Sequence, residues 1–168
     1  MNALPLFGIA ALIGALIAIT RTQGPTDVNA LQPATTRRIN RDFTRLDPSF
    51  RARLERMLAE LNAEGFDAIM WEGYRTPERA KDMVARGVGK LESMHRLGLA
   101  ADIISAKDRW NASLAFRNAL HDAAARNGLT SGLAGDPWHV QALPWEYDAR
   151  LFAMAADKRT EFVRTLRG

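Results

Sequence analysis

The stretch SMHRLGLAADII, residues 93–104, carries the most information about the fold of this chain. Its second half, Leu99 to Ile104, is short and apolar and follows Gly98, which predicts a β-strand. Side chains alternate along a strand, so Asp102 lies as a lone carboxylate among apolar neighbours. Burying an unpartnered carboxylate is costly; the strand can supply backbone N–H donors, and a metal ion supplies the strongest compensation. His95 can approach the same point from a second backbone direction.

A second stretch, GDPWHVQ at residues 135–141, offers an imidazole at His139 and a carboxylate at Asp136, with a proline between them to bend the chain. The chain has no cysteine and three histidines, so any metal must be held by histidine and carboxylate. His95, Asp102 and His139 would leave the fourth position of a tetrahedral zinc ion to water, as in catalytic zinc sites. Asp136 could then serve as the general base.

Elsewhere, helix and strand patterns mix without a regular βαβ repeat, which favours an α+β fold over a doubly wound sheet. Helices are expected from Asp47 to Gly65, at 76–86 and 111–127 and after Pro144, and further strands at 66–71 and 138–141. The third histidine, His121, falls inside an expected helix, where we assign it to packing or to the surface.

The beginning of the chain has a different composition, because Ala3 to Thr20 contain no charged residue. A helix of that length reaches across a bilayer core of about 30 Å. We therefore expect a signal anchor or transmembrane helix at residues 1–22, a tether at 23–40 and one catalytic domain at 41–168. A cleaved signal peptide is the alternative, although no basic residue precedes the apolar run and no clean small-x-small site follows it. The positive-inside rule conflicts with an exported domain, because several arginines follow the segment, and the orientation stays open.

The metal motif resembles a known family. Ser93-x-His95-x-x-Gly98-x-Ala100-x-Asp102, followed by Asp136-x-x-His139, resembles the VanY-like, LAS-type zinc peptidases of the D-alanyl-D-alanine carboxypeptidase group. Gly73-Tyr74-Arg75-Thr76 is similar to the Gly-Tyr-Arg-Ser segment of that family, and the match spans roughly residues 47–142. The resemblance implies a small antiparallel sheet flanked by helices, one Zn²⁺ ion held by His95, Asp102 and His139, and the peptidoglycan stem peptide as substrate.

Two departures narrow the expected activity. Carboxypeptidases of the family usually carry Glu three residues before the second histidine, whereas this chain carries Asp136, and Val140-Gln141 follow His139. Both features resemble the phage endolysins that cut the L-alanyl-D-glutamate bond. The resemblance therefore implies an endopeptidase, with a D,D-carboxypeptidase as runner-up. A non-catalytic wall-binding module is a third hypothesis, and the intact Asp136 argues against it.

Three further side chains are expected at the site. Arg75 could bind a substrate carboxylate or stabilise the oxyanion, and its alternative is a surface arginine near a helix start. Ser93 could donate to the substrate or act as a turn residue. Trp138 could form a wall of the cleft or pack in the core.

The net charge and the uncharged N-terminal segment indicate what the protein contacts and where it is located. The chain has 23 Lys and Arg against 19 Asp and Glu, a net charge of +4 that suits an anionic wall polymer without singling it out. We expect a monomer that binds no nucleic acid and contacts the membrane through residues 3–20. Such a phage-encoded or bacterial protein would be anchored in the inner membrane, with its catalytic domain in the periplasm or released to the cell wall.

Overall fold

The computed structural model describes residues 39–165. The membrane segment expected at residues 1–22 and nearly all of the tether at 23–40 lie outside the described residues. Between residues 39 and 165, no helix combines the length and the apolar character that crossing a membrane requires.

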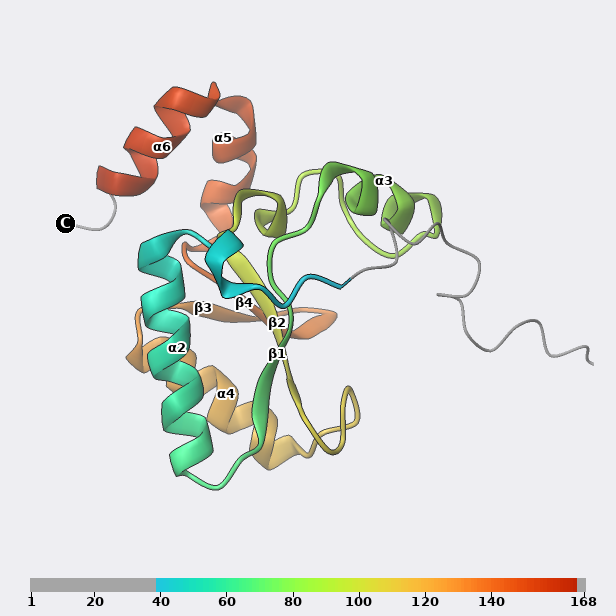
Figure 1. Cartoon of the computed structure of the whole chain (residues 1–168), viewed down its shortest axis with the longest axis vertical. Helices are drawn as coiled ribbons and strands as arrows, with labels where there is room; N and C mark the ends of the chain where they lie inside the picture. The colour runs from blue at the N-terminus through green and yellow to red at the C-terminus, as the bar shows by residue number, and fades with distance from the viewer. Residues whose placement is uncertain (1–38, 166–168) are drawn as a thin grey trace, which may run out of the picture. The chain divides into compact units, whose positions relative to one another are not determined.

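The described chain folds into helices and strands that alternate irregularly (Figure 1). The helices are α2 (Pro48–Ala63), α3 (Pro77–Ala85), α4 (Leu114–Arg126), α5 (Asp148–Ala153) and α6 (Ala156–Thr165). The strands are β1 (Ala68–Glu72), β2 (Ala100–Ser105), β3 (Thr130–Leu133) and β4 (Asp136–Gln141), and short 3₁₀ turns are η2 (Phe43–Arg45), η3 (Met94–Leu97) and η4 (Trp145–Tyr147).

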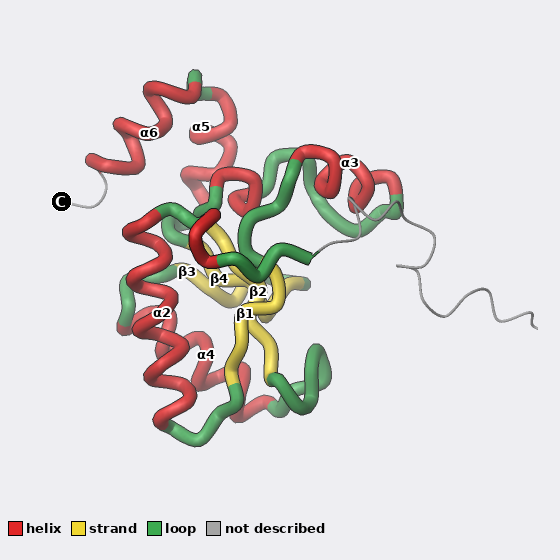
Figure 2. Tube along the Cα trace, viewed as in Figure 1, coloured by secondary structure: helices red, strands yellow, loops and turns green. Residues whose placement is uncertain are grey.

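The four strands form one sheet in the order β1-β2-β4-β3, and every neighbouring pair is antiparallel. Helices α2 and α4 lie side by side along this sheet in Figure 2, and their apolar side chains share one core with Ala101, Ile103 and Val140. The α+β fold with a small antiparallel sheet flanked by helices is therefore confirmed.

Helix α2 forms where the sequence predicts it. Asp47 accepts hydrogen bonds from the backbone N–H groups of Ser49 and Phe50, and Pro48 occupies the first turn, where its missing N–H is not needed. The helix buries Phe50, Leu54, Met57 and Leu61 at helical spacing. Each such burial contributes about 1.5–3 kcal/mol, so α2 is fixed to the sheet mainly by this stripe.

The register of the sheet brings polar residues of three strands into one row. Glu72 of β1 is paired with Asp102 of β2, which is paired in turn with His139 of β4. The β1–β2 register shifts by one residue between Met70 and Glu72, so a β-bulge includes Trp71. In a regular ladder Trp71 would stand opposite Asp102; the bulge puts Glu72 there instead.

Three local expectations differ from the structure. Strand β3 was not expected, and β4 begins at Asp136, so the proline after it continues the strand instead of bending the chain. The single helix expected after Pro144 is a 3₁₀ turn followed by α5 and α6. The chain is extended at Met154, and Arg159 of α6 donates to the carbonyl oxygens of Leu151 and Met154 at 2.8 and 3.0 Å. These bonds satisfy carbonyl groups at the end of α5, which allows the helix to stop there.

Candidate metal centre

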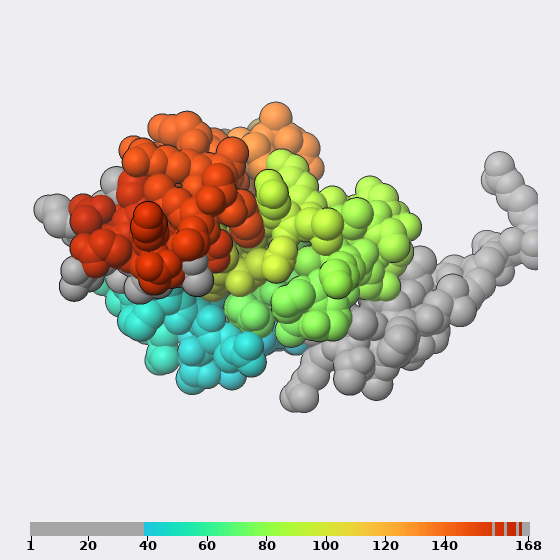
Figure 3. Space-filling model, turned by 90° about the horizontal axis from the view of Figure 1, so that it is seen from above, coloured from blue at the N-terminus to red at the C-terminus, as the bar shows by residue number. Residues whose placement is uncertain are grey.

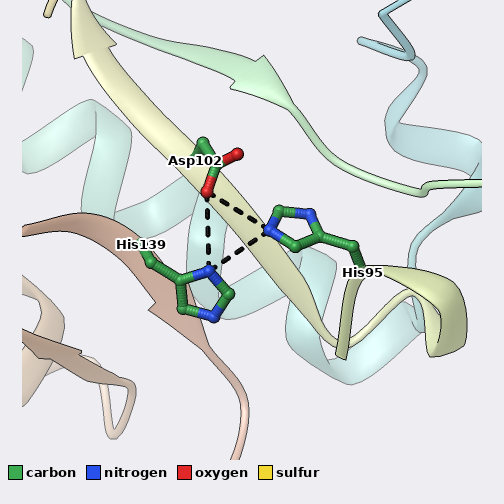
Figure 4. A group of neighbouring side chains, drawn as sticks. All are labelled: His95, Asp102 and His139. Atoms are coloured by element: carbon green, nitrogen blue, oxygen red, sulfur yellow. Dashed lines mark hydrogen bonds and ion pairs between the residues drawn. The ribbon is translucent and has the colours of Figure 1, made fainter. Parts of the chain in front are cut away.

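Three side chains from three elements converge on one point (Figure 4). His95 lies in η3, Asp102 in the middle of β2 and His139 in β4, and all three residues are buried. His95 Nε2 lies 3.2 Å from His139 Nδ1 and 3.2 Å from Asp102 Oδ1, and His139 Nδ1 lies 3.5 Å from the same Asp102 oxygen. The structure thus brings together the three ligands predicted from the sequence.

The outer nitrogen of each imidazole faces an oxygen that can only accept a hydrogen bond. His95 Nδ1–H donates to the carbonyl oxygen of Gly73 at 2.7 Å, and His139 Nε2–H donates to Gln141 Oε1 at 3.1 Å. The Gln141 amide is oriented by its own donor group, which bonds the carbonyl oxygen of Leu143 at 2.7 Å. With its proton on this outer nitrogen, each neutral ring turns a lone pair towards Asp102, which is the tautomer that metal binding requires.

This donor set fits a zinc ion. At bond lengths of about 2.0–2.1 Å, the ligand atoms of a tetrahedral zinc ion lie about 3.3 Å apart. The three observed separations of 3.2, 3.2 and 3.5 Å match that edge length. Two lone pairs and a carboxylate oxygen repel one another at such distances, and a cation between them removes the repulsion.

Electrostatics at the cluster favour the charged carboxylate. Burial alone would raise the pKa of Asp102, but the adjacent His95 and His139 outweigh burial and hold this pKa far below its ordinary value. Burial likewise opposes a charge on His139, yet the hydrogen bond and the negative charge of Asp102 raise the pKa of that imidazole. Asp102 therefore stays an anion that attracts positive charge to the centre.

Arg75 stands beside the cluster in a buried ion-pair network that the sequence did not reveal. Its Nε and Nη2 atoms donate to Glu72 Oε2 at 3.1 and 2.5 Å, and Nη2 lies 3.6 Å from Asp102 Oδ2. The other carboxylate oxygen of Glu72 accepts from Arg79 of α3. Glu72 thus fixes Arg75 in one orientation at the edge of the metal centre.

A cleft of about 570 Å³ opens over the cluster. Three of the predicted site residues line it: Ser93 and Arg75, expected to meet the substrate, and Asp136, expected as the general base. Asp136 Oδ2 lies 4.0 Å from His139 Nδ1. In a regular strand, residues 136 and 139 would lie on opposite faces of β4. The pairing of β4 with β3 is irregular at this end, and both side chains line the cleft. Burial and then the charge of Asp102 raise the pKa of Asp136, which brings the carboxylate closer to the working range of a general base.

The two tryptophans near the cluster differ in position. Trp138 is packed against Phe116 of α4, with ring centroids 6.0 Å apart, and does not line the cleft. Trp145 lines the cleft instead, 5.4 Å from the ring of His139. Trp138 thus has the packing role that the sequence left as its alternative. His121 also packs: its Nε2 lies 3.0 Å from the carbonyl oxygen of Pro137.

The sequence did not reveal that Glu72, Gln141 and Trp145 take part in this site. Gln141 had a detectable signal, because a residue two positions after His139 on a strand shares its face. Glu72 had a weaker one, the position just before Gly73-Tyr74-Arg75, and only the bulge brings it opposite Asp102. Trp145 had none, because it enters through a 3₁₀ turn that follows Pro144.

Comparisons of the sequence with protein families and with curated proteins find no match. Solved structures do match. The LD-carboxypeptidase LdcB, whose structure is described as revealing the basis of peptidoglycan recognition, is 19% identical over 67% of this chain and 74% of its own, with a TM-score of 0.51. The L-Ala D-Glu endopeptidase ChiX of Serratia marcescens is 21% identical over 63% of this chain and 86% of its own, with a TM-score of 0.48.

A third match is the D,D-pentapeptidase VanY of a VanB-type vancomycin resistance cassette, in a structure with Zn(II). It is 20% identical over 65% of this chain and 79% of its own, with a TM-score of 0.47. The similarity to LdcB shows that this chain shares the fold of that protein.

Proposed function

We propose that this chain is a zinc-dependent peptidase that hydrolyses the stem peptide of peptidoglycan, at the L-alanyl-D-glutamate bond. The observation that carries the proposal is the arrangement of His95, Asp102 and His139, whose three acceptor atoms are spaced as tetrahedral zinc requires. The fold shared with LdcB and the sequence motifs support the wall peptide as substrate.

Zinc bound by these three residues would supply Lewis acidity, which lowers the pKa of water and polarises the substrate carbonyl. Asp136, at the mouth of the cleft, accepts the proton of the attacking water and returns it to the amine nitrogen as the C–N bond breaks. Arg75 offers a fixed guanidinium to the substrate, because Glu72 holds its Nε and Nη2 atoms. Hydrolysis thus adds the hydroxyl of water to the acyl carbon and its proton to the leaving amine.

The shape of the surface supports an internal bond as the target. The cleft shares Lys90 and Asp148 with a second hollow, which Leu91 and Phe152 also line. Two parts of the chain border this hollow: α3 with the residues that follow it, and α5. In Figure 3 the first part is green, the second is orange-red, and the two meet at the surface. A peptide can therefore continue past the metal centre, as an endopeptidase requires. Asp136 and Val140-Gln141, which resemble endolysin residues, favour the same bond.

One observation favours a D,D-carboxypeptidase as the second candidate. Arg75 is a buried guanidinium that lines the cleft, and such a group binds a terminal carboxylate well. The two activities give different products. An endopeptidase releases a fragment that begins with D-glutamate, whereas a carboxypeptidase releases D-alanine.

The test is product analysis by mass spectrometry, with the full-length chain acting on defined stem peptides. We expect cleavage between L-alanine and D-glutamate that stops on chelation, returns with zinc and is lost in His139→Ala. Release of D-alanine alone would replace the endopeptidase by the carboxypeptidase. Equal hydrolysis by wild type and His139→Ala would refute the metal mechanism, and unchanged wall digestion by Asp136→Asn would remove the general base.

We also propose, from the sequence alone, that residues 3–20 anchor the chain in the inner membrane and deliver the domain to the wall. The support is the uncharged run of eighteen residues, which is rich in alanine and glycine and thus only moderately hydrophobic. Cell fractionation before and after collapse of the membrane potential tests this. The full-length chain should move from the membrane fraction to the wall, and a chain that is never in the membrane fraction would refute the anchor.

A further inference from the structure

Four side chains form an aromatic and basic surface, here named the aromatic ledge: Arg41, Trp71, Arg109 and Trp110. The guanidinium carbons of Arg41 and Arg109 lie 4.5 and 5.4 Å from the ring centroid of Trp71. The rings of Trp71 and Trp110 meet edge to face, with centroids 5.9 Å apart. None of these residues takes part in the metal centre or in the proposed proton transfer.

Hydrogen bonds of the backbone fix the loop that carries Arg109 and Trp110. The loop after β2 is fixed at its start, where the carbonyl and carboxylate oxygens of Asp67 accept from the N–H groups of Ala106 and Lys107 at 2.8 and 2.7 Å. Arg109 N–H then donates to the carbonyl oxygen of Ser105 at 3.1 Å, with Arg109 at φ 57°, a left-handed conformation rare outside glycine. A site presented by a pinned backbone binds with little loss of conformational entropy.

The ledge is accessible and continuous with the cleft. Trp110 is 43% exposed, and it lines the same cleft as Asp102 and Asp136. A large exposed aromatic side chain at the edge of a binding cleft is typical of a contact site. Arg41 and Arg109 are also exposed and add hydrogen-bond donors to the indole surface.

We propose that the aromatic ledge binds the glycan strand of the substrate whose stem peptide enters the cleft. The proposal rests on the proposed function, because it places the glycan beside the peptide that the cleft receives. The C–H face of a pyranose ring is apolar and packs on an indole, while its hydroxyl and N-acetyl oxygens accept hydrogen bonds from guanidinium groups. An anionic peptide would use the two arginines but would leave the exposed indole of Trp110 without a role.

The first experiment measures sugar binding by the full-length chain, with N-acetylglucosamine oligomers as the probe and indole N–H chemical shifts as the signal. Trp110→Ala should weaken binding roughly tenfold. Arg109→Gly should also weaken binding, although glycine suits the left-handed backbone, because the guanidinium is lost. The matched control is Leu114→Ala, which removes a 60% exposed apolar side chain outside the ledge and should leave binding unchanged.

The second experiment compares hydrolysis of a free stem peptide with that of a stem attached to glycan. Trp110→Ala should lower kcat/KM for the attached stem by roughly tenfold more than for the free stem. An equal loss on both substrates, or no sugar binding by wild type, would overturn the glycan assignment. Binding of polyglutamate in place of the oligomers, weakened by Arg109→Gly and unchanged by Trp110→Ala, would also overturn it and indicate an anionic-peptide site.

The two proposals fail separately, because sugar binding needs neither zinc nor catalysis and can be measured with a chelator present. Stem cleavage without sugar binding would reject the ledge and keep the peptidase. Sugar binding that depends on Trp110, without stem cleavage, would keep the glycan site and reject the peptidase.

Discussion

Replacing Gln141 with leucine is expected to weaken zinc binding about 10- to 100-fold. Gln141 is buried, and its Oε1 accepts the Nε2–H of His139 at 3.1 Å. Leucine has a similar size but no acceptor. A zinc ion needs the Nδ1 lone pair of His139, so the proton must stay on Nε2, where it would be buried without a partner. That costs about 1–3 kcal/mol, or roughly 5- to 150-fold in the dissociation constant.

The penalty falls mainly on the metal-bound protein. Without metal, the imidazole can move its proton to Nδ1, which lies 3.5 Å from Asp102 Oδ1. The metal-free variant therefore escapes most of the cost, and the loss is measured as affinity more than as stability. This difference separates a role in setting the tautomer from a role in packing alone.

The assay is competition for zinc between the full-length chain and a chromophoric chelator at fixed pH. Asp148→Asn is the matched control, because asparagine keeps an oxygen that can accept from Gln141 Nε2, now 2.9 Å from Asp148 Oδ1. It should bind zinc within a few-fold of wild type. A Gln141→Leu variant with wild-type zinc affinity, or one that loses unfolding stability to the same extent with and without metal, would refute the reasoning.

Three other predictions follow from buried charge, a raised pKa and a tight turn. Glu72→Gln removes the charge that two buried guanidinium groups share, so the free energy of unfolding in urea should fall by about 3–5 kcal/mol; an unchanged midpoint would contradict the network. Asp136 must be deprotonated to act as a base, and burial raises its pKa above the ordinary 3.8, so kcat/KM should fall as pH drops through that raised pKa. If the residual activity of Asp136→Asn still falls at low pH with the same midpoint, the fall in kcat/KM belongs to the titration of another group. Gly98 has a φ of +68°, and the methyl group of Gly98→Ala would lie 2.7 Å from the carbonyl oxygen of Arg45. Gly65 has a φ of +89°, but the methyl group of Gly65→Ala would meet nothing within 4 Å. Calorimetry should therefore show the larger loss of thermal stability for Gly98→Ala.

Local signals were sufficient for much of this fold. Helix α2 begins at the Asp47-Pro48 cap and ends before Gly65, as predicted, because the cap and the apolar stripe act within the helix itself. Strand β2 follows Gly98, whose φ of 68° allows the turn out of η3. The candidate ligands His95 and Asp102 lie on either side of that turn, so a short stretch of sequence already determined most of their relative position.

Contacts between distant segments were not predictable in the same way. Strand β3, with sequence TSGL, lacks an apolar alternation and exists because β4 pairs with it. The break between α5 and α6 depends on Arg159 reaching back to carbonyl groups of α5. The choice of Trp145 over Trp138 for the cleft follows from which face of β4 turns towards α4. In each case, tertiary packing overrides a local pattern.

The bulge at Trp71 shows how one residue of register can determine the chemistry of the centre. In a regular β1–β2 ladder, Glu72 would lie opposite Ala101. Its side chain would then face the side of the sheet opposite to Asp102. The extra residue moves Glu72 opposite Asp102, where its carboxylate can hold Arg75 within 3.6 Å of Asp102 Oδ2. The same irregularity leaves Trp71 in contact with Trp110, where it forms part of the aromatic ledge. One inserted position thus orients the guanidinium at the metal centre and supplies an indole to the surface proposed to bind the glycan.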